Sequence, residues 1–227
     1  MKTLLLLAGY PRTGTHSLAD IYRNNPIRFI SSQFGNQVQD FKETYILVDN
    51  LKTIDDYILD YMDLVDQYPD CIPADFTTTN TNLSEETLIE LKEKAKPYFN
   101  IKVLLSLRHP VDRVKSLYYK NLEWKYQKRP LIPADYDIRS FHNEIPYLET
   151  YSKYKKHFPV LVIDGIHYQK TFYRKKELSE FIECDLPEVE SVHKNSSTNT
   201  GHLNKFEERK LYKLYSRDIE TWERLCY

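Results

Sequence analysis

The sequence predicts an α/β fold with three layers, in which helices cover both faces of a parallel β-sheet. Two short apolar runs, at residues 3–8 and 101–107, are typical of strands that are buried on both faces. Between and after these runs, apolar residues recur at the three-to-four spacing of amphipathic helices. Because strands that alternate with helices form parallel sheets, this order predicts the layered arrangement.

The first half of the chain alternates between short strand patterns and helical patterns. The sequence Asn-Asn-Pro at residues 24–26 ends the first helix, and Ser84 caps the third. Residues 33–50 fit no single pattern. The predicted elements are a strand at 3–8, a helix at 15–23, a strand at 27–31, a helix at 53–68, a strand at 71–76, a polar loop at 77–82 and a helix at 84–98.

The second half continues the alternation. Pro110 suits the first turn of a helix, since proline is tolerated there. The polar segment 128–146 contains three prolines and predicts a long surface loop that is a candidate lid over a cleft. The predicted elements are a strand at 101–107, a helix at 110–127, a helix at 147–157, a strand at 160–163, a helix at 175–183, a polar loop at 191–201 and an amphipathic helix at 205–225.

Length and composition predict one domain, residues 1–227, without repeats. The net charge is −1, so no overall basic field favours nucleic acid and any anion site must be local. The apolar start leads into Gly-Tyr-Pro-Arg rather than a cleavage site, and no segment approaches the roughly 20 apolar residues that span a bilayer. Three scattered cysteines form no disulfide or zinc pattern. We therefore expect a cytoplasmic protein without membrane insertion.

The first strand leads into a loop, Gly9 to Ser17, with the arrangement strand–Gly-x-x-x-x-Gly–helix. Such P-loop-like segments hold phosphate groups, because backbone N–H groups and the helix N-terminus point at the anion. The chain has only 5 glycines, and two of them are Gly9 and Gly14. This concentration indicates that the backbone of the loop requires glycine.

The residues around Gly14 indicate which anion the loop holds. A nucleoside triphosphatase loop places lysine directly after the second glycine, but Thr15 and His16 stand there instead. A cation comes two residues earlier, at Arg12. The stretch Tyr10 to Thr15 resembles the 5′-phosphosulfate loop of the sulfotransferase family, Pro-Lys-Ser/Thr-Gly-Thr-Thr.

A second motif follows the strand at 101–107. The segment from Arg108 to Tyr119 resembles the 3′-phosphate motif of the same family, Arg-x-Pro-x-x-Arg-x-x-Ser-x-Tyr. Arg108 follows a strand end, where α/β folds bind ligands, and a nearby hydroxyl, Ser116, can share one phosphate with it. We expect Arg113, Tyr118 and Tyr119 to be structural rather than part of the site.

This resemblance implies a donor, 3′-phosphoadenosine 5′-phosphosulfate (PAPS), and requires no metal. It continues weakly through residues 160–165 and through a helix at 177–182, where Glu183 replaces the glycine of the family's Phe-Leu-Gly. Residues 193–199 match a polar loop that closes over the nucleotide in the family. The implied donor-binding residues are Arg12, Thr13, Gly14, Thr15, His16, Ser17, Arg108, Ser116, Lys194, Asn195 and Ser196.

An acceptor hydroxyl needs a general base. Lys42 and Glu43 resemble the Lys-Glu segment of carbohydrate-type sulfotransferases, which implies Glu43 as the base and Lys42 as an aid to the leaving group, beside Arg12. A solvated charge pair is the alternative explanation. His16, His109 and Asp75 are other candidates for the base, and His109 is better explained as a structural residue.

Three functions are compatible with these motifs. The first is a sulfotransferase acting on an acceptor hydroxyl, with the Lys-Glu segment favouring a carbohydrate. The second is a nucleotide or small-molecule kinase with a degenerate loop, for which Asp164 is the candidate magnesium ligand. The third is a nucleotide-binding module without catalytic activity.

Overall fold

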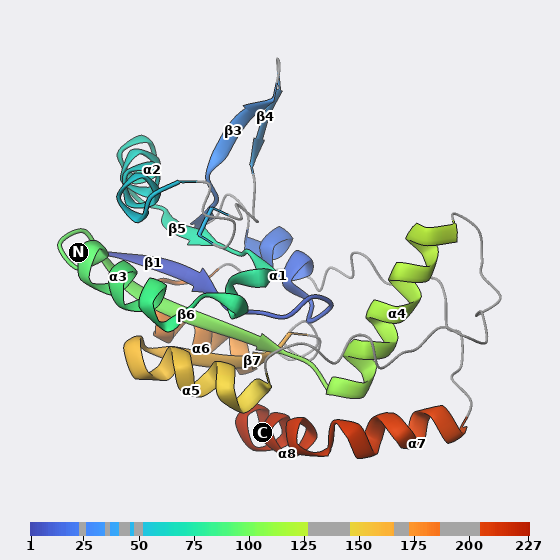
Figure 1. Ribbon diagram of the computed structural model, residues 1–227. Helices are drawn as coiled ribbons and strands as arrows, with labels where there is room; N and C mark the ends of the chain where they lie inside the picture. The colour runs from blue at the N-terminus through green and yellow to red at the C-terminus, as the bar shows by residue number, and fades with distance from the viewer. Residues whose placement is uncertain are drawn as a thin grey trace.

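The central element is a five-stranded sheet with the order β2-β5-β1-β6-β7, in which every neighbouring pair is parallel. This computed structural model describes residues 1–22, 26–34, 37–40, 46–47, 52–126, 146–165, 173–186 and 205–227. Figure 1 shows helices on both sides of the sheet, so the predicted three-layer α/β fold is confirmed. The strands of the sheet are β1 (Lys2–Leu7), β2 (Ile27–Arg28), β5 (Ile72–Asp75), β6 (Phe99–Leu107) and β7 (Val160–Asp164).

The helices follow the predicted order closely. Thr53 forms a capping box with Asp56 at the start of α2, and the Ser84 hydroxyl accepts from the Thr87 amide at the start of α3, as predicted. The helices are α1 (Thr15–Tyr22), α2 (Ile54–Gln67), α3 (Glu85–Ala95), α4 (Pro110–Tyr126), α5 (Tyr147–His157), α6 (Tyr173–Ile182), α7 (Lys205–Leu214) and α8 (Ser216–Cys226).

The two faces of β1 bury alternate side chains in separate clusters. Leu4 and Leu6 pack in the cluster formed with α2, α3, α5 and α8, whereas Leu5 and Leu7 pack with α1 and α6. Successive strand residues point to opposite faces, so a strand that is apolar at every position is buried on both sides. The apolar run at the start of the chain therefore forms the centre of the molecule.

The segment predicted as one strand at 27–31 is divided. Residues 27 and 28 pair with β5 at the edge of the sheet. From Ser31 the chain enters a separate antiparallel hairpin of β3 (Ser31–Phe34) and β4 (Gln37–Asp40), which projects beyond the body of the molecule in Figure 1. The prediction of a single strand was therefore too long, because the chain leaves the sheet after two residues.

The polar stretch at 77–82 is not the solvated loop that we expected. Most of it is a 3₁₀ helix, η1 (Thr78–Asn82), in which Thr78, Asn80 and Thr81 are buried. Asn80 Nδ2 donates to the Leu7 carbonyl at 3.2 Å, and the Tyr154 hydroxyl donates to the Asn80 carbonyl. These hydrogen bonds satisfy polar groups that would otherwise be costly to bury.

The single helix expected at 205–225 is two helices, which meet at Tyr215. Leu211 and Tyr215 pack against Val111 and Val114 of α4, whereas α8 packs Trp222 against the large cluster beside the sheet. Figure 1 shows α7 and α8 following one another across the lower edge of the molecule. Both helices contact α4, and the break at Tyr215 lets α8 also reach α5 and β7.

A buried lysine holds the end of α6. Lys102 of β6 is 5% exposed, and its Nζ donates to the Phe181 carbonyl at 2.6 Å and to Glu183 Oε1 at 2.7 Å. Glu183 has a φ of 59°, the left-handed conformation that usually favours glycine after a helix. Glu183 therefore has a backbone conformation that glycine usually supplies after a helix, and the ion pair with Lys102 supports Glu183 in it.

Two further findings concern membranes and cysteines. Within the described ranges, every helix is too short or too polar to cross a membrane. Cys71, Cys184 and Cys226 are all free thiols.

The Lys102–Glu183 ion pair predicts a pH dependence of stability. Lys102 holds the pKa of the Glu183 carboxyl below its ordinary value through a hydrogen bond and charge. A lowered folded-state pKa stabilises the fold above the unfolded pKa of about 4.3 and loses that effect as pH falls further. We expect Glu183→Gln to melt at a lower temperature than the wild type at pH 7, and this difference to shrink as pH falls below the unfolded pKa and through the lowered folded-state pKa. A constant difference across this pH range would contradict the assignment.

Candidate anion site at the ends of strands β1 and β6

The two predicted phosphate motifs begin at the carboxyl ends of adjacent strands. β1 and β6 are neighbours, with Leu7 paired to Leu104, and the Ala8 amide donates to the Leu104 carbonyl at 3.0 Å. From β1 the chain continues to β2, towards one edge of the sheet, and from β6 it continues to β7, towards the opposite edge. Ligands of open α/β sheets bind where the connections diverge in this way. The fold therefore places both motifs at its expected binding position.

The loop after β1 has two residues with left-handed backbone. Arg12 has a φ of 71° and Gly14 a φ of 84°. Gly14 thus supplies the conformational freedom that the sequence indicated, and its carbonyl accepts from the Leu18 amide at the start of α1. A Cβ at Gly9 would lie 3.1 Å from the Thr15 methyl group. Gly9 is therefore tightly packed, and Gly14 is needed for its conformation.

The side chains of the loop divide into buried and exposed ones. Thr13 is fully buried, and its hydroxyl donates to the Tyr10 carbonyl at 2.8 Å. Thr15 is also buried, whereas the His16 side chain is exposed. Ser17 lies in the first turn of α1. Thr13 and Thr15 consequently belong to the interior of the loop, which leaves backbone amides of the loop as the groups that can face an anion.

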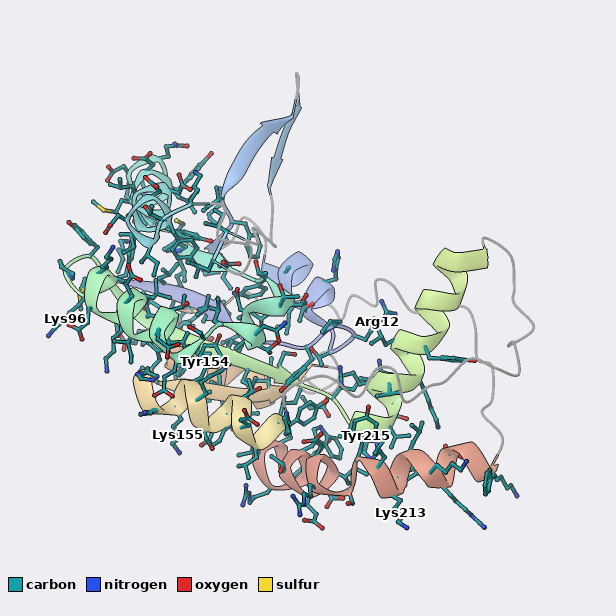
Figure 2. All side chains as sticks on the ribbon, in the orientation of Figure 1. Arg12, Lys96, Tyr154, Lys155, Lys213 and Tyr215 are labelled. Carbon is teal, nitrogen blue, oxygen red and sulfur yellow. The ribbon has the colours of Figure 1, made fainter. Side chains whose placement is uncertain are left out.

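Arg12 joins the loop to the second motif. Its Nε donates to Ser116 Oγ at 3.0 Å, across 104 residues of sequence, and Figure 2 shows Arg12 lying between the loop and α4. Arg108 Nη1 donates to the Arg12 carbonyl at 3.2 Å. Three predicted site residues, Arg12, Arg108 and Ser116, are therefore brought together by the fold.

The surroundings of Arg108 favour an anionic ligand. Desolvation by burial lowers the pKa of Arg108 below its ordinary value, Asp112 opposes this change, and the nearby positive charge of Arg12 adds to it. An arginine keeps its charge in such surroundings, since its ordinary pKa is above about 12. Two guanidinium groups held close together in a partly desolvated site are stabilised by an anion between or beside them.

Several alternative candidates have structural partners instead. Asp75 is 1% exposed, and its carboxylate accepts from the Tyr57 hydroxyl and from the amide and hydroxyl of Thr77. The His109 ring packs edge-on against Trp222 with centroids 5.0 Å apart. Asp75 thus anchors the turn after β5, and His109 belongs to the contact with α8, as expected for a structural residue.

Asp164 is held away from the role of a free metal ligand. It lies at the carboxyl end of β7, and its Oδ2 accepts from Trp222 Nε1 at 3.1 Å. Asp164 is also only 2% exposed. This contact ties the carboxylate to α8, which weakens the kinase alternative.

Five residues of the predicted site lie outside the described part of the chain. They are Lys42, Glu43, Lys194, Asn195 and Ser196.

An aromatic support under the loop was not predicted from sequence. The Arg113 guanidinium lies over the Tyr10 ring, 5.1 Å from its centroid, and over the Tyr147 ring at 5.8 Å. The Tyr10 hydroxyl shares a 2.6 Å hydrogen bond with Thr150, and Tyr147 donates to the Arg108 carbonyl at 2.9 Å. Arg113 thus packs over tyrosine rings beneath the loop, a structural position of the kind expected for it.

Two small residues that contact Thr13 were also missed. Ser106 of β6 and Gly165, directly after β7, both lie against the Thr13 carbonyl. The glycine directly after the apolar run 160–163 was the available signal, since a glycine at a strand end often marks close backbone approach. Their contacts depend on the order of the strands.

Neither a protein-family model nor a curated protein matches this chain.

The left-handed backbone at Arg12 predicts that a glycine variant will be more stable than an alanine variant there, the reverse of the usual order. We expect Arg12→Gly to be more stable than Arg12→Ala by roughly 0.5–1 kcal/mol, which is the cost of left-handed backbone less the larger unfolded entropy of glycine. Urea denaturation of both variants measures the difference.

Arg209, an exposed residue within α7, provides the matched control for this prediction. There the order reverses, and Arg209→Ala should be more stable than Arg209→Gly by about 1 kcal/mol. The same order at both positions would show that Arg12 carries no backbone strain.

Proposed function

We propose that this protein is a sulfotransferase that transfers a sulfuryl group from PAPS to an acceptor hydroxyl. The observation that carries the proposal is the contact of Arg12 with both parts of the second motif, through Ser116 Oγ and the Arg108 guanidinium. Each motif resembles one half of the donor site in the sulfotransferase family. The two motifs meet at the carboxyl ends of adjacent strands, which supports a single ligand that carries both a 5′-phosphosulfate and a 3′-phosphate.

The residues present suit that donor. In the proposal, the loop amides and the N-terminus of α1 hold the 5′-phosphosulfate, and Arg108 and Ser116 hold the 3′-phosphate. PAPS supplies the sulfuryl group and a stable phosphate leaving group. Arg12 stabilises the negative charge that develops on the leaving phosphate but keeps its proton, because arginine does not deprotonate in proteins.

The remaining parts of the proposal come from sequence resemblance. Glu43 is the proposed base that removes the acceptor proton, and Lys42 assists the leaving group. Residues 194–196 are proposed to close over the nucleotide. The Lys-Glu segment favours a carbohydrate acceptor.

Binding of nucleotides tests the donor. We expect 3′,5′-ADP, the product of PAPS, to raise the melting temperature, because a ligand at 100 times its Kd stabilises the native state by about 2.7 kcal/mol. For a chain of this size that corresponds to a shift of roughly 5–10 °C. ATP with magnesium, at the same concentration, is the comparison, and stabilisation by ATP with magnesium alone would replace the sulfotransferase proposal with the kinase.

Glu43→Gln tests the base. We expect the variant to release 3′,5′-ADP from PAPS at least about 100-fold more slowly in the presence of a mixture of carbohydrate acceptors, since a positioned base typically contributes 10²–10⁴-fold. Its affinity for 3′,5′-ADP should not change.

Glu220→Gln, at an exposed position of α8, is the matched control for charge removal and should turn over normally. Unchanged turnover in Glu43→Gln would refute the assignment of the base. Donor binding without turnover in the wild type would favour the non-catalytic module.

A further inference from the structure

The carbonyl of Thr13 is the most constrained group of the loop. Ser106 Oγ donates to it at 2.9 Å from β6, across 93 residues of sequence. Gly165 lies so close that a Cβ there would be 1.7 Å from the Thr13 oxygen and 2.4 Å from Ser106 Oγ. The Gly165 amide donates to the Leu107 carbonyl at 2.9 Å, which fixes Gly165 beside β6. Three consecutive strands of the sheet, β1, β6 and β7, therefore meet at one oxygen atom.

This constraint also determines the direction of the next amide. The peptide bond is planar and trans, so its C=O and N–H groups point in opposite directions. The Thr13 oxygen points at the ends of β6 and β7, and the Gly14 N–H must point away from them, out of the sheet. The structure gives the Gly14 amide no acceptor among the residues it describes. A donor held in this way is oriented before any ligand arrives, which is the arrangement that stabilises charge best.

We propose that Ser106 and Gly165 are positioning residues that hold the Thr13–Gly14 peptide with its N–H directed at the 5′-phosphosulfate. This inference rests on the proposed donor site and adds residues that touch neither phosphate. Ser106 supplies the hydrogen bond that holds the carbonyl. Gly165 supplies the space, because any larger side chain would push the Thr13 carbonyl out of place and turn the amide with it.

A positioning role for Ser106 and a merely stabilising role predict different effects on the binding of the two phosphates. The Ser106 hydroxyl contacts the peptide of the loop, whereas the proposed 3′-phosphate ligands, Arg108 and Ser116, lie after the strand. Loss of the Ser106 hydroxyl should therefore weaken the hold on a 5′-phosphate and leave the hold on a 3′-phosphate unchanged. A general loss of stability would weaken both equally.

Calorimetry with two nucleotides tests this inference. We expect Ser106→Ala to bind 3′,5′-ADP about tenfold more weakly than the wild type. This is the effect expected when the Gly14 N–H loses one well-aligned hydrogen bond to the charged 5′-phosphate. Its affinity for 3′-AMP, which lacks the 5′-phosphate, should stay the same. Ser106→Cys keeps a weak donor of similar size and should recover part of the loss. Gly165→Ala should show the same selective loss.

Thr221→Val is the matched control. Thr221 is also a buried residue whose hydroxyl donates to a backbone carbonyl, that of Arg217 at 2.8 Å, but it lies in α8. The Thr221→Val variant should leave the ratio of the affinities for 3′,5′-ADP and 3′-AMP unchanged. Equal weakening of both nucleotides in Ser106→Ala, or no weakening of either, would overturn the positioning role while the donor site stands. A wild type that binds 3′,5′-ADP no better than 3′-AMP would instead overturn the proposed 5′-site and this inference with it.

Discussion

The burial of β1 on both faces is the constraint on which the rest of the structure depends. An apolar strand with Leu5 fully buried on one side and Leu6 on the other must lie inside a sheet, with strands on both edges and helices on both faces. β1 ends close to the end of β5, whereas β6 continues three residues beyond its pairing with Leu7. The loop after β1 therefore begins between the backbones of these two strands.

In that loop, contacts with the rest of the fold override the conformational preference of a single residue. Arg12 occupies the left-handed region, which costs a non-glycine residue roughly 1–2 kcal/mol. The surrounding structure sustains this cost through the Thr13 hydroxyl, the Ser106 hydroxyl and the Arg108 guanidinium, each of which donates to a carbonyl of the loop. Strain of this kind is concentrated at functional sites, where the surrounding contacts over-determine the conformation. The unusual backbone is thus consistent with a binding role for the loop.

Buried tyrosines provide much of the polar support around the site. Tyr10, Tyr147 and Tyr154 combine large apolar rings with hydroxyls that reach Thr150, the Arg108 carbonyl and the Asn80 carbonyl. Burial raises the pKa of Tyr10 above its ordinary value, so the hydroxyl stays neutral at physiological pH. The Arg113 guanidinium lies over the rings of Tyr10 and Tyr147. These tyrosines thus belong to the core of the protein.

The sequence by itself determined most of the elements and the residue types of the two motifs, because both depend on local features. The apolar runs, the spacing of helical residues and the cap at Ser84 are properties of short segments, and they predicted the sheet strands and most helices closely. Tertiary structure alone decided which distant groups meet. It placed Ser116 beside Arg12, buried the polar segment Thr78–Asn82, divided the last helix at Tyr215 and aligned Ser106 and Gly165 on one carbonyl. Strand order determines these contacts, and the periodicity of a segment carries no information about the strand that will lie next to it.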